Sequence, residues 1–210
     1  MLRVTLAMIL IAAVAGPSDL GAQKKIGDRV RTNASEPIVT GVLRDIPFST
    51  IEELTAGAEW TVEARLSGAR SHVAAAQYDV QTDYRIFPDR VIKGSILVKD
   101  VRPSLPTHPI LTVYGGQITI DGVKVLSIDH NMNDERHEGY YLKEGCRYLL
   151  FLRRFPGRPD RYQLYNGGAF EITDQTVKPL LKGYAEKFKE TVEQPYEQIV
   201  KRVQQAARNR

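Results

Sequence analysis

The chain has 210 residues, of which 42% are hydrophobic and 26% charged, and it contains one cysteine, Cys146. This composition is typical of a folded globular protein, and a single cysteine excludes an internal disulfide framework. The net charge of +4 belongs to the C-terminal tail, because residues 178–210 carry eight basic residues against four glutamates. The preceding part of the chain is therefore close to neutral, which argues against an extended nucleic-acid surface.

Residues 1–22 predict a signal peptide. Arg3 precedes an apolar run of roughly a dozen residues, fewer than the ~20 that a membrane-spanning helix requires. We expect cleavage near Ala15 or Ala22 and export to the periplasm or the medium. Residues 23–45 are polar and interrupted by glycine and proline, so they predict a flexible, loosely packed arm with strand-like pieces at 38–40 and 42–43.

Residues 46–177 predict one domain of short strands. A short helix at 50–56 comes first, with a capping box formed by Ser49 and Glu52 and a stop at Gly57. Residues 59–66 alternate between apolar and polar, as in a half-buried strand, and 67–77 predict a connecting loop. A second strand at 82–95 must bulge at Pro88, because proline cannot donate to a strand ladder.

The later strands of this domain are also short. Asp121-Gly122 predicts a two-residue hairpin turn within 118–125, and the large apolar residues of 145–153 predict a central strand covered on both faces. The other strands expected are at 95–101, 110–114, 162–165 and 169–172. Many short strands with almost no helix between them indicate a mainly β fold, a small OB-like β-barrel.

Residues 178–210 predict amphipathic helix. Pro195 is suited to the first turn of a second helix or of a kinked continuation. We expect the tail to pack on its own barrel rather than on a membrane, because glutamates are interspersed among its lysines. The apolar residues of the two segments are Leu181, Tyr184 and Phe188, then Tyr196, Ile199, Val200 and Val203.

A family resemblance follows from the order of four stretches. These are Ile51-Glu-Glu-Leu54, Glu59-Trp-Thr-Val-Glu-Ala-Arg65, the segment 84–94, and 143–152 with Gly145-Cys-Arg-Tyr-Leu-Leu-Phe151. In this order the chain resembles the netrin-like, or tissue-inhibitor-of-metalloproteinase-like, OB barrels of small exported bacterial proteins of unassigned function, over residues 49–172. The resemblance implies the barrel and a following helix. It does not carry over the zinc-chelating N-terminal cysteine of the animal inhibitors, because Cys146 lies inside the expected central strand.

On function, we expect an exported binding module without enzymatic activity, cofactor or metal, whose ligand is a protein or a glycan. The sequence assigns no catalytic residue and no binding residue. One alternative is a metal-dependent hydrolase that uses Asp129, His130 and His137. Their spacing matches neither the i, i+4 histidine pair of zinc proteases nor a calcium loop.

A second alternative is single-stranded nucleic-acid binding, which OB barrels perform with aromatic side chains along a basic groove. The candidate residues are Tyr84, Tyr114, Tyr148, Tyr162 and Tyr165 with Arg85, Arg147, Arg153, Arg154 and Arg161. The neutral charge of the barrel region and the expected export oppose this alternative. We interpret the tyrosines as barrel wall and rim, with hydroxyls that reach water.

Overall fold

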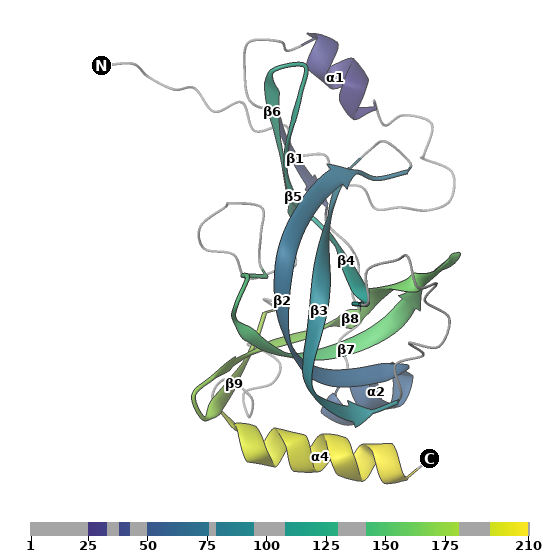
Figure 1. Cartoon of the computed structure of the whole chain (residues 1–210), viewed down its shortest axis with the longest axis vertical. Helices are drawn as coiled ribbons and strands as arrows, with labels where there is room; N and C mark the ends of the chain where they lie inside the picture. Colours follow the sequence, from purple (N-terminus) through teal and green to yellow (C-terminus); the bar gives the residue numbers. More distant parts are fainter. Residues whose placement is uncertain are drawn as a thin grey trace.

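The structure is a computed structural model that describes residues 25–32, 38–42, 50–75, 79–94, 108–129, 142–180 and 194–209. Its fold is mainly β (Figure 1). The expected signal peptide, the expected strand at 95–101 and the helical segment with Leu181, Tyr184 and Phe188 lie outside the described residues. Within the described part of the chain, no helix is long and apolar enough to cross a membrane.

Five strands close into a ring. β2 pairs with β3 and β7, β7 also pairs with β8, and β4 joins β3 to β8, with β4 and β8 parallel. Each of these strands therefore has hydrogen-bonded neighbours on both sides. This arrangement confirms the mainly β fold. The strands of the ring are β2 (Trp60–Val73), β3 (Val80–Lys93), β4 (Ile110–Tyr114), β7 (Arg147–Phe155) and β8 (Arg158–Thr173).

A three-stranded sheet extends from one end of the ring (Figure 1). It consists of β1 (Ile38–Val42), parallel to β6 (Val123–Asp129), and β5 (Gly116–Ile120), antiparallel to β6. The expected hairpin at 118–125 is confirmed, because Asp121 and Gly122 have the positive φ angles, 49° and 81°, of its two-residue turn.

The described part of the N-terminal arm is packed against this sheet. α1 (Ile26–Thr32) was not predicted, and it forms a small hydrophobic cluster with β1 and β6. Ile26, Val30 and Ile38 are buried there. The sequence around these residues is polar, and only these three apolar side chains of the arm make the contact. The sequence pattern therefore did not indicate that they are buried.

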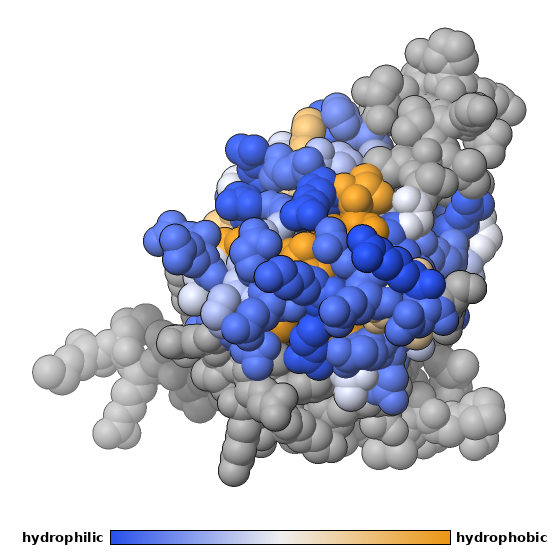
Figure 2. Space-filling model, turned by 90° about the horizontal axis from the view of Figure 1, so that it is seen from below, coloured by the Kyte–Doolittle hydropathy of each residue, from blue (hydrophilic) through white to orange (hydrophobic). Residues whose placement is uncertain are grey.

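The helices that follow α1 in the described residues lie at the opposite end of the ring from the three-stranded sheet (Figure 1). α4 (Tyr196–Arg208) contacts α2 (Ile51–Gly57) and β3, and it follows the short pair β9 (Thr176–Pro179) and β10 (Gln194–Pro195). Seen from this end, the surface is mostly hydrophilic with small, separate apolar areas (Figure 2). The predicted packing of the C-terminal helix on its own sheet is confirmed for α4, whose buried residues are Ile199, Val200 and Val203.

The capping box of α2 lies one residue later than predicted. Thr50 is the N-cap, and its hydroxyl accepts from the backbone N–H of Glu53 at 3.1 Å. The Glu53 carboxylate accepts in return from the backbone N–H of Thr50 at 2.8 Å. Both Ser49–Glu52 and Thr50–Glu53 satisfy the sequence pattern, so the pattern alone could not choose between them. The helix ends at Gly57, as predicted.

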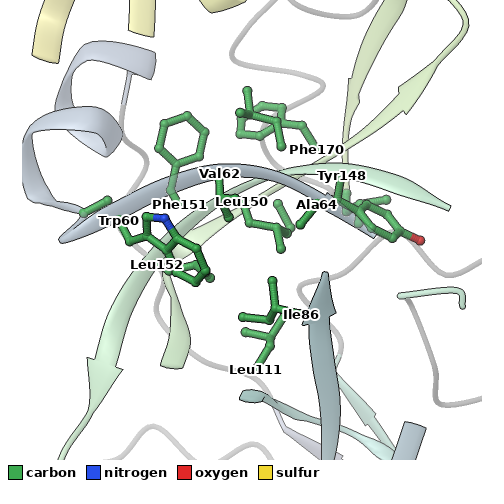
Figure 3. Close-up of a cluster of buried hydrophobic side chains, with 14 of the residues drawn as sticks. Trp60, Val62, Ala64, Ile86, Leu111, Tyr148, Leu150, Phe151, Leu152 and Phe170 are labelled. Atoms are coloured by element: carbon green, nitrogen blue, oxygen red, sulfur yellow. The ribbon is translucent and has the colours of Figure 1, made fainter. Parts of the chain in front are cut away.

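The core has two layers (Figure 3). Side chains inside the ring include Trp60, Ile86 and Leu111, whereas Phe151 and Phe170 lie on the outer side of β7 and β8, toward the helices. Tyr148 to Leu152 of β7 are each no more than 1% exposed. The central strand is thus covered on both faces, as its apolar sequence predicts.

Two core tyrosines correct the interpretation of the tyrosines as wall and rim with hydroxyls in water. Tyr84 and Tyr148 are each 1% exposed. The Tyr84 hydroxyl donates to the carbonyl of Leu142 at 3.0 Å, and the Tyr148 hydroxyl accepts from the backbone N–H of Lys143 at 2.7 Å. The turn before β7 therefore supplies the polar partners that buried hydroxyls need.

β2 is longer than predicted and β3 bends as predicted. The strand β2 continues through the expected loop at 67–77 as far as Val73. In β3, Ala64 faces Pro88 and Glu63 faces Arg90, so Asp89 is an extra residue in a bulge. The bulge next to the proline confirms the prediction.

Candidate functional site

A polar surface crosses four neighbouring strands of the ring on their outer side. Residues directly opposite each other in adjacent strands project to the same face. Arg70 of β2 faces Asp83 of β3, which faces Thr112 of β4, while Arg85 of β3 is linked through Ile110 of β4 to Arg161 of β8. We call this surface the basic face and define it by Arg70, His72, Asp83, Arg85, Thr112 and Arg161.

Asp83 is the centre of the basic face. Its carboxylate forms an ion pair with Arg161, accepts the Thr112 hydroxyl at 2.7 Å and lies 3.8 Å from Nδ1 of His72. The Arg161 guanidinium also donates to the Thr112 hydroxyl at 3.3 Å. Asp83 and Arg161 are largely buried, with side chains 16% and 18% exposed. The ion pair of Asp83 and Arg161 is therefore held in a fixed position beneath the more exposed residues.

A bulge in β2 determines which side chains reach this face. Ser67 faces Arg85 and Arg70 faces Asp83, so β2 contains one residue more than β3 over this interval. Side chains alternate between the two faces of a strand, and one extra residue reverses the alternation. Up to Leu66, the even-numbered side chains of β2 point into the ring, and Arg70 and His72 are also even-numbered. Without the bulge, both side chains would point into the ring.

The bulge is held by glycine geometry and by one long-range hydrogen bond. Gly68 has a φ of 67°, in the left-handed region that favours glycine. The next residue, Ala69, donates its backbone N–H to the Glu144 carboxylate at 2.7 Å. The side chain of Arg85 passes beside Gly68, at ordinary contact distance from the position that a Cβ would occupy.

The basic face has an excess of positive charge. It contains three arginines and one aspartate, and the aspartate is already paired with the least exposed arginine, Arg161. Arg70 and Arg85 are exposed, and neither forms an ion pair with another residue of the described part of the chain. Nε of Arg161 is buried and has no hydrogen-bond partner among the described residues. The arrangement can attract and hydrogen-bond an anionic group.

A second polar network joins α4 to the ring. Glu63 of β2 is 4% exposed, and its carboxylate accepts from Arg147 of β7 and from the hydroxyl of Tyr196, the first residue of α4. Burial, together with the hydrogen bond and the negative charge of Glu63, raises the pKa of Tyr196 to about 12. The hydrogen bond to Glu63 raises the pKa of Arg147 as well. These contacts hold the C-terminal helix in place, and the Glu63 carboxylate is already engaged by both partners.

The tyrosines proposed for nucleic-acid binding do not form a stacking surface. Tyr84, Tyr148 and Tyr162 are 1%, 1% and 7% exposed. Tyr114 is partly buried at the end of β4, and Tyr165 lies against Gly57 of α2. A base could not stack on the three buried rings, which are part of the core.

The arginines of that set separate into two groups. Arg85 and Arg161 belong to the basic face, whereas the other three lie elsewhere and have partners of their own. Those pairs are Arg147 with Glu63, Arg153 with the Gly57 carbonyl and the Tyr165 ring, and Arg154 with Glu59. Sequence reasoning thus found two residues of the face and missed Arg70, His72, Asp83 and Thr112. The available signal was the alternation of Asp83 and Arg85 with the buried Tyr84.

The residues of the alternative metal site are not placed by the structure. His130 and His137 lie outside the described residues, and Asp129 is described only through its backbone, at the end of β6. Among the described residues, no group of three or more His, Cys, Asp or Glu side chains could hold a metal ion. Cys146 is a partly buried free thiol just before β7.

An open groove of about 390 Å³ lies near α1, at the C-terminal end of β2. It is lined by Gly27, by Val73, Ala74 and Ala75, and by Ile120. Its lining among the described residues consists of apolar side chains and glycine without a charged group, so these side chains could not form an ion pair with a ligand as those of the basic face could.

Comparison with known proteins found no similar protein. No family model, no curated protein and no solved structure matches the chain.

Proposed function

We propose that this protein is an exported, non-enzymatic binding module whose ligand, a protein or a glycan, contacts the basic face. The observation that carries the proposal is the pair of exposed arginines, Arg70 and Arg85, neither of which forms an ion pair with a carboxylate of the described chain. They lie above the largely buried ion pair of Asp83 and Arg161. Charged groups held on strands are well oriented for recognition, because the strands fix their spacing.

The position of the face supports a binding role by analogy of fold. OB-type barrels bind extended ligands on the face formed by their second and third strands. In this ring those strands are β3 and β4, which carry Asp83, Arg85 and Thr112. The ring interior, in contrast, is filled by large side chains such as Trp60 and Leu111. A surface ligand fits this packing better than an enclosed one. The analogy concerns the fold alone.

Export is part of the proposal and rests on the sequence. The apolar run in residues 1–22 is followed by the small residues Ala15 and Ala22, as in a cleaved signal. We also propose that the domain is netrin-like. The strand ring with a helix before it and a helix after it supports this assignment at the level of the fold.

The test is site-specific photo-cross-linking in the native envelope and medium. A photoreactive amino acid at position 70 should form an adduct, whereas the same amino acid at the exposed position of Gln205 in α4 should not. Protease treatment would then separate protein adducts from glycan adducts. Adducts of equal yield at both positions, or none at position 70, would remove the basic face as the binding site.

A further inference from the structure

We infer that the ligand of the basic face is an anionic polysaccharide, with carboxylate or sulfate as the charged group. This inference rests on the proposed function and names its ligand class. Arg70 and Arg85 make the contacts with the anionic groups, and Arg161 adds positive charge from beneath.

The donor set selects anions. A guanidinium presents a planar fork of N–H donors that matches the oxygens of a carboxylate or a sulfate. Asp83 accepts from Arg161 and Thr112, so it does not neutralise the two exposed arginines. An anion that reaches the face therefore finds two guanidinium groups that form no ion pair within the described chain, although the Glu144 carboxylate lies at the neighbouring Ala69.

The spacing of the arginines favours an extended ligand over a single small anion. Arg70 and Arg85 project from adjacent strands, and Arg85 lies two residues along β3 from Asp83, the residue opposite Arg70. Arg161 lies two strands away from Arg85, across β4. Because neighbouring strands are about 4.8 Å apart, the strand positions of Arg70 and Arg161 are separated by roughly 14 Å across the sheet. A polymer with repeated charges can contact such a row, whereas one small anion cannot.

The hydrophilic character of the face argues against a protein partner. Protein interfaces are centred on buried aromatic and apolar anchors. Among the described residues, the only large hydrophobic side chain that is exposed is Val91, and it lies in the distal half of β3, beyond the Pro88 bulge. The exposed groups of the basic face are charged, and the only apolar side chain between Arg85 and Arg161 in the register is the half-buried Ile110.

The buried tyrosines argue against single-stranded nucleic acid. Such ligands bind through bases stacked on aromatic rings in addition to phosphate contacts. Tyr84 and Tyr162, on two of the strands that form the face, point into the ring and are 1% and 7% exposed. Tyr114 is the one tyrosine on the outer side of β4 in the same register as the face. Phe87 follows Arg85 on the outer side of β3, but its ring packs against His108, with ring centroids 4.3 Å apart. These rings and that of Tyr114 are each half-buried, so they do not present a row of open faces for stacking.

The test measures binding of the purified mature protein to five probes at low ionic strength. The probes are polygalacturonate, dextran sulfate, uncharged dextran, oligodeoxythymidine and poly-glutamate. We expect binding to one or both anionic polysaccharides, tighter than to the oligonucleotide or the peptide at equal charge, and no binding to uncharged dextran. The first two probes distinguish carboxylate from sulfate as the preferred group.

Variants connect the binding to the two arginines. Each loss of a charged hydrogen bond should weaken binding about tenfold, so Arg70→Gln/Arg85→Gln should weaken it on the order of a hundredfold. Arg70→Lys/Arg85→Lys keeps the charge without the fork and should be intermediate. The matched control Lys201→Gln/Arg208→Gln removes two exposed charges from α4 and should bind as the unmodified protein does. Equal melting temperatures would show that all variants fold.

Three outcomes would overturn the inference: no binding to either anionic polysaccharide, tighter binding of the oligonucleotide or poly-glutamate, or unchanged affinity of the glutamine variant. In each of these cases a cross-link from position 70 to another ligand would still uphold the proposed function. Absence of both the cross-link and polysaccharide binding would overturn the two proposals together.

Discussion

Removal of the Arg147 side chain should destabilise the protein measurably, because it leaves the buried carboxylate of Glu63 without its cation. The Glu63 side chain is 6% exposed and the Arg147 side chain 43% exposed. Breaking a fully buried ion pair costs about 3–5 kcal/mol. Since water reaches Arg147, we expect a smaller loss for Arg147→Ala, about 2 kcal/mol of unfolding free energy. In a chain of this size, that loss lowers the melting temperature by roughly 4–8 °C.

Urea and thermal unfolding of matched variants test this reasoning. The control is Arg154→Ala, because the pair of Arg154 and Glu59 is 3.7 Å apart with side chains 41% and 51% exposed. Exposed pairs contribute about 0–1 kcal/mol, so this control should remain close to the unmodified protein. The double variant Glu63→Gln/Arg147→Ala should lose less than the sum of its two single changes. If Arg147→Ala is no less stable than Arg154→Ala, the assignment of a buried, compensated charge is wrong.

Three further predictions concern other parts of the chain. Because the pKa of Tyr196 is raised to about 12 in the folded protein, its contribution to stability is present below the ordinary tyrosine pKa of about 10 and is lost between pH 10 and about 12. The unmodified protein should therefore lose more stability over that pH range than Tyr196→Phe, and parallel pH profiles of the two proteins would contradict this. Gly57→Ala should destabilise the protein by about 1–3 kcal/mol, because the new Cβ would lie 2.2 Å from the Tyr165 ring; an unchanged urea midpoint would be evidence against this packing. Metal analysis of untagged protein should find no stoichiometric zinc, whereas zinc that is lost on replacing His130 and His137 would support the hydrolase alternative.

The sequence predicted the elements whose local pattern is complete. Alternation identified the first half of β2, the Asp121-Gly122 pair identified the hairpin, and Pro88 identified the bulge of β3. The apolar run of β7 correctly indicated burial on both faces. In these segments the local preference and the tertiary structure agree.

The sequence did not predict the basic face, because a register shift creates it. The small and polar residues after Leu66 have the composition of a loop, and their strand pairing with β3 is not encoded in any local period. The bulge between Ser67 and Arg70 then moves Arg70 and His72 to the outer side. Parallel pairing of β4 with β8 brings Arg161 to the same surface from a distant part of the chain. Such long-range pairings depend on the whole fold.

The most direct measurement of the central claim is NMR mapping of the full-length mature protein titrated with polygalacturonate or dextran sulfate. Our proposals predict that backbone amide shifts change around Arg70, Asp83, Arg85, Thr112 and Arg161, and that amides of α4 remain unaffected. The glutamine variant of the two exposed arginines should show none of these changes. Shifts that concentrate on α1 and the β5–β6 hairpin, or on α4, would contradict the assignment of the basic face as the binding surface.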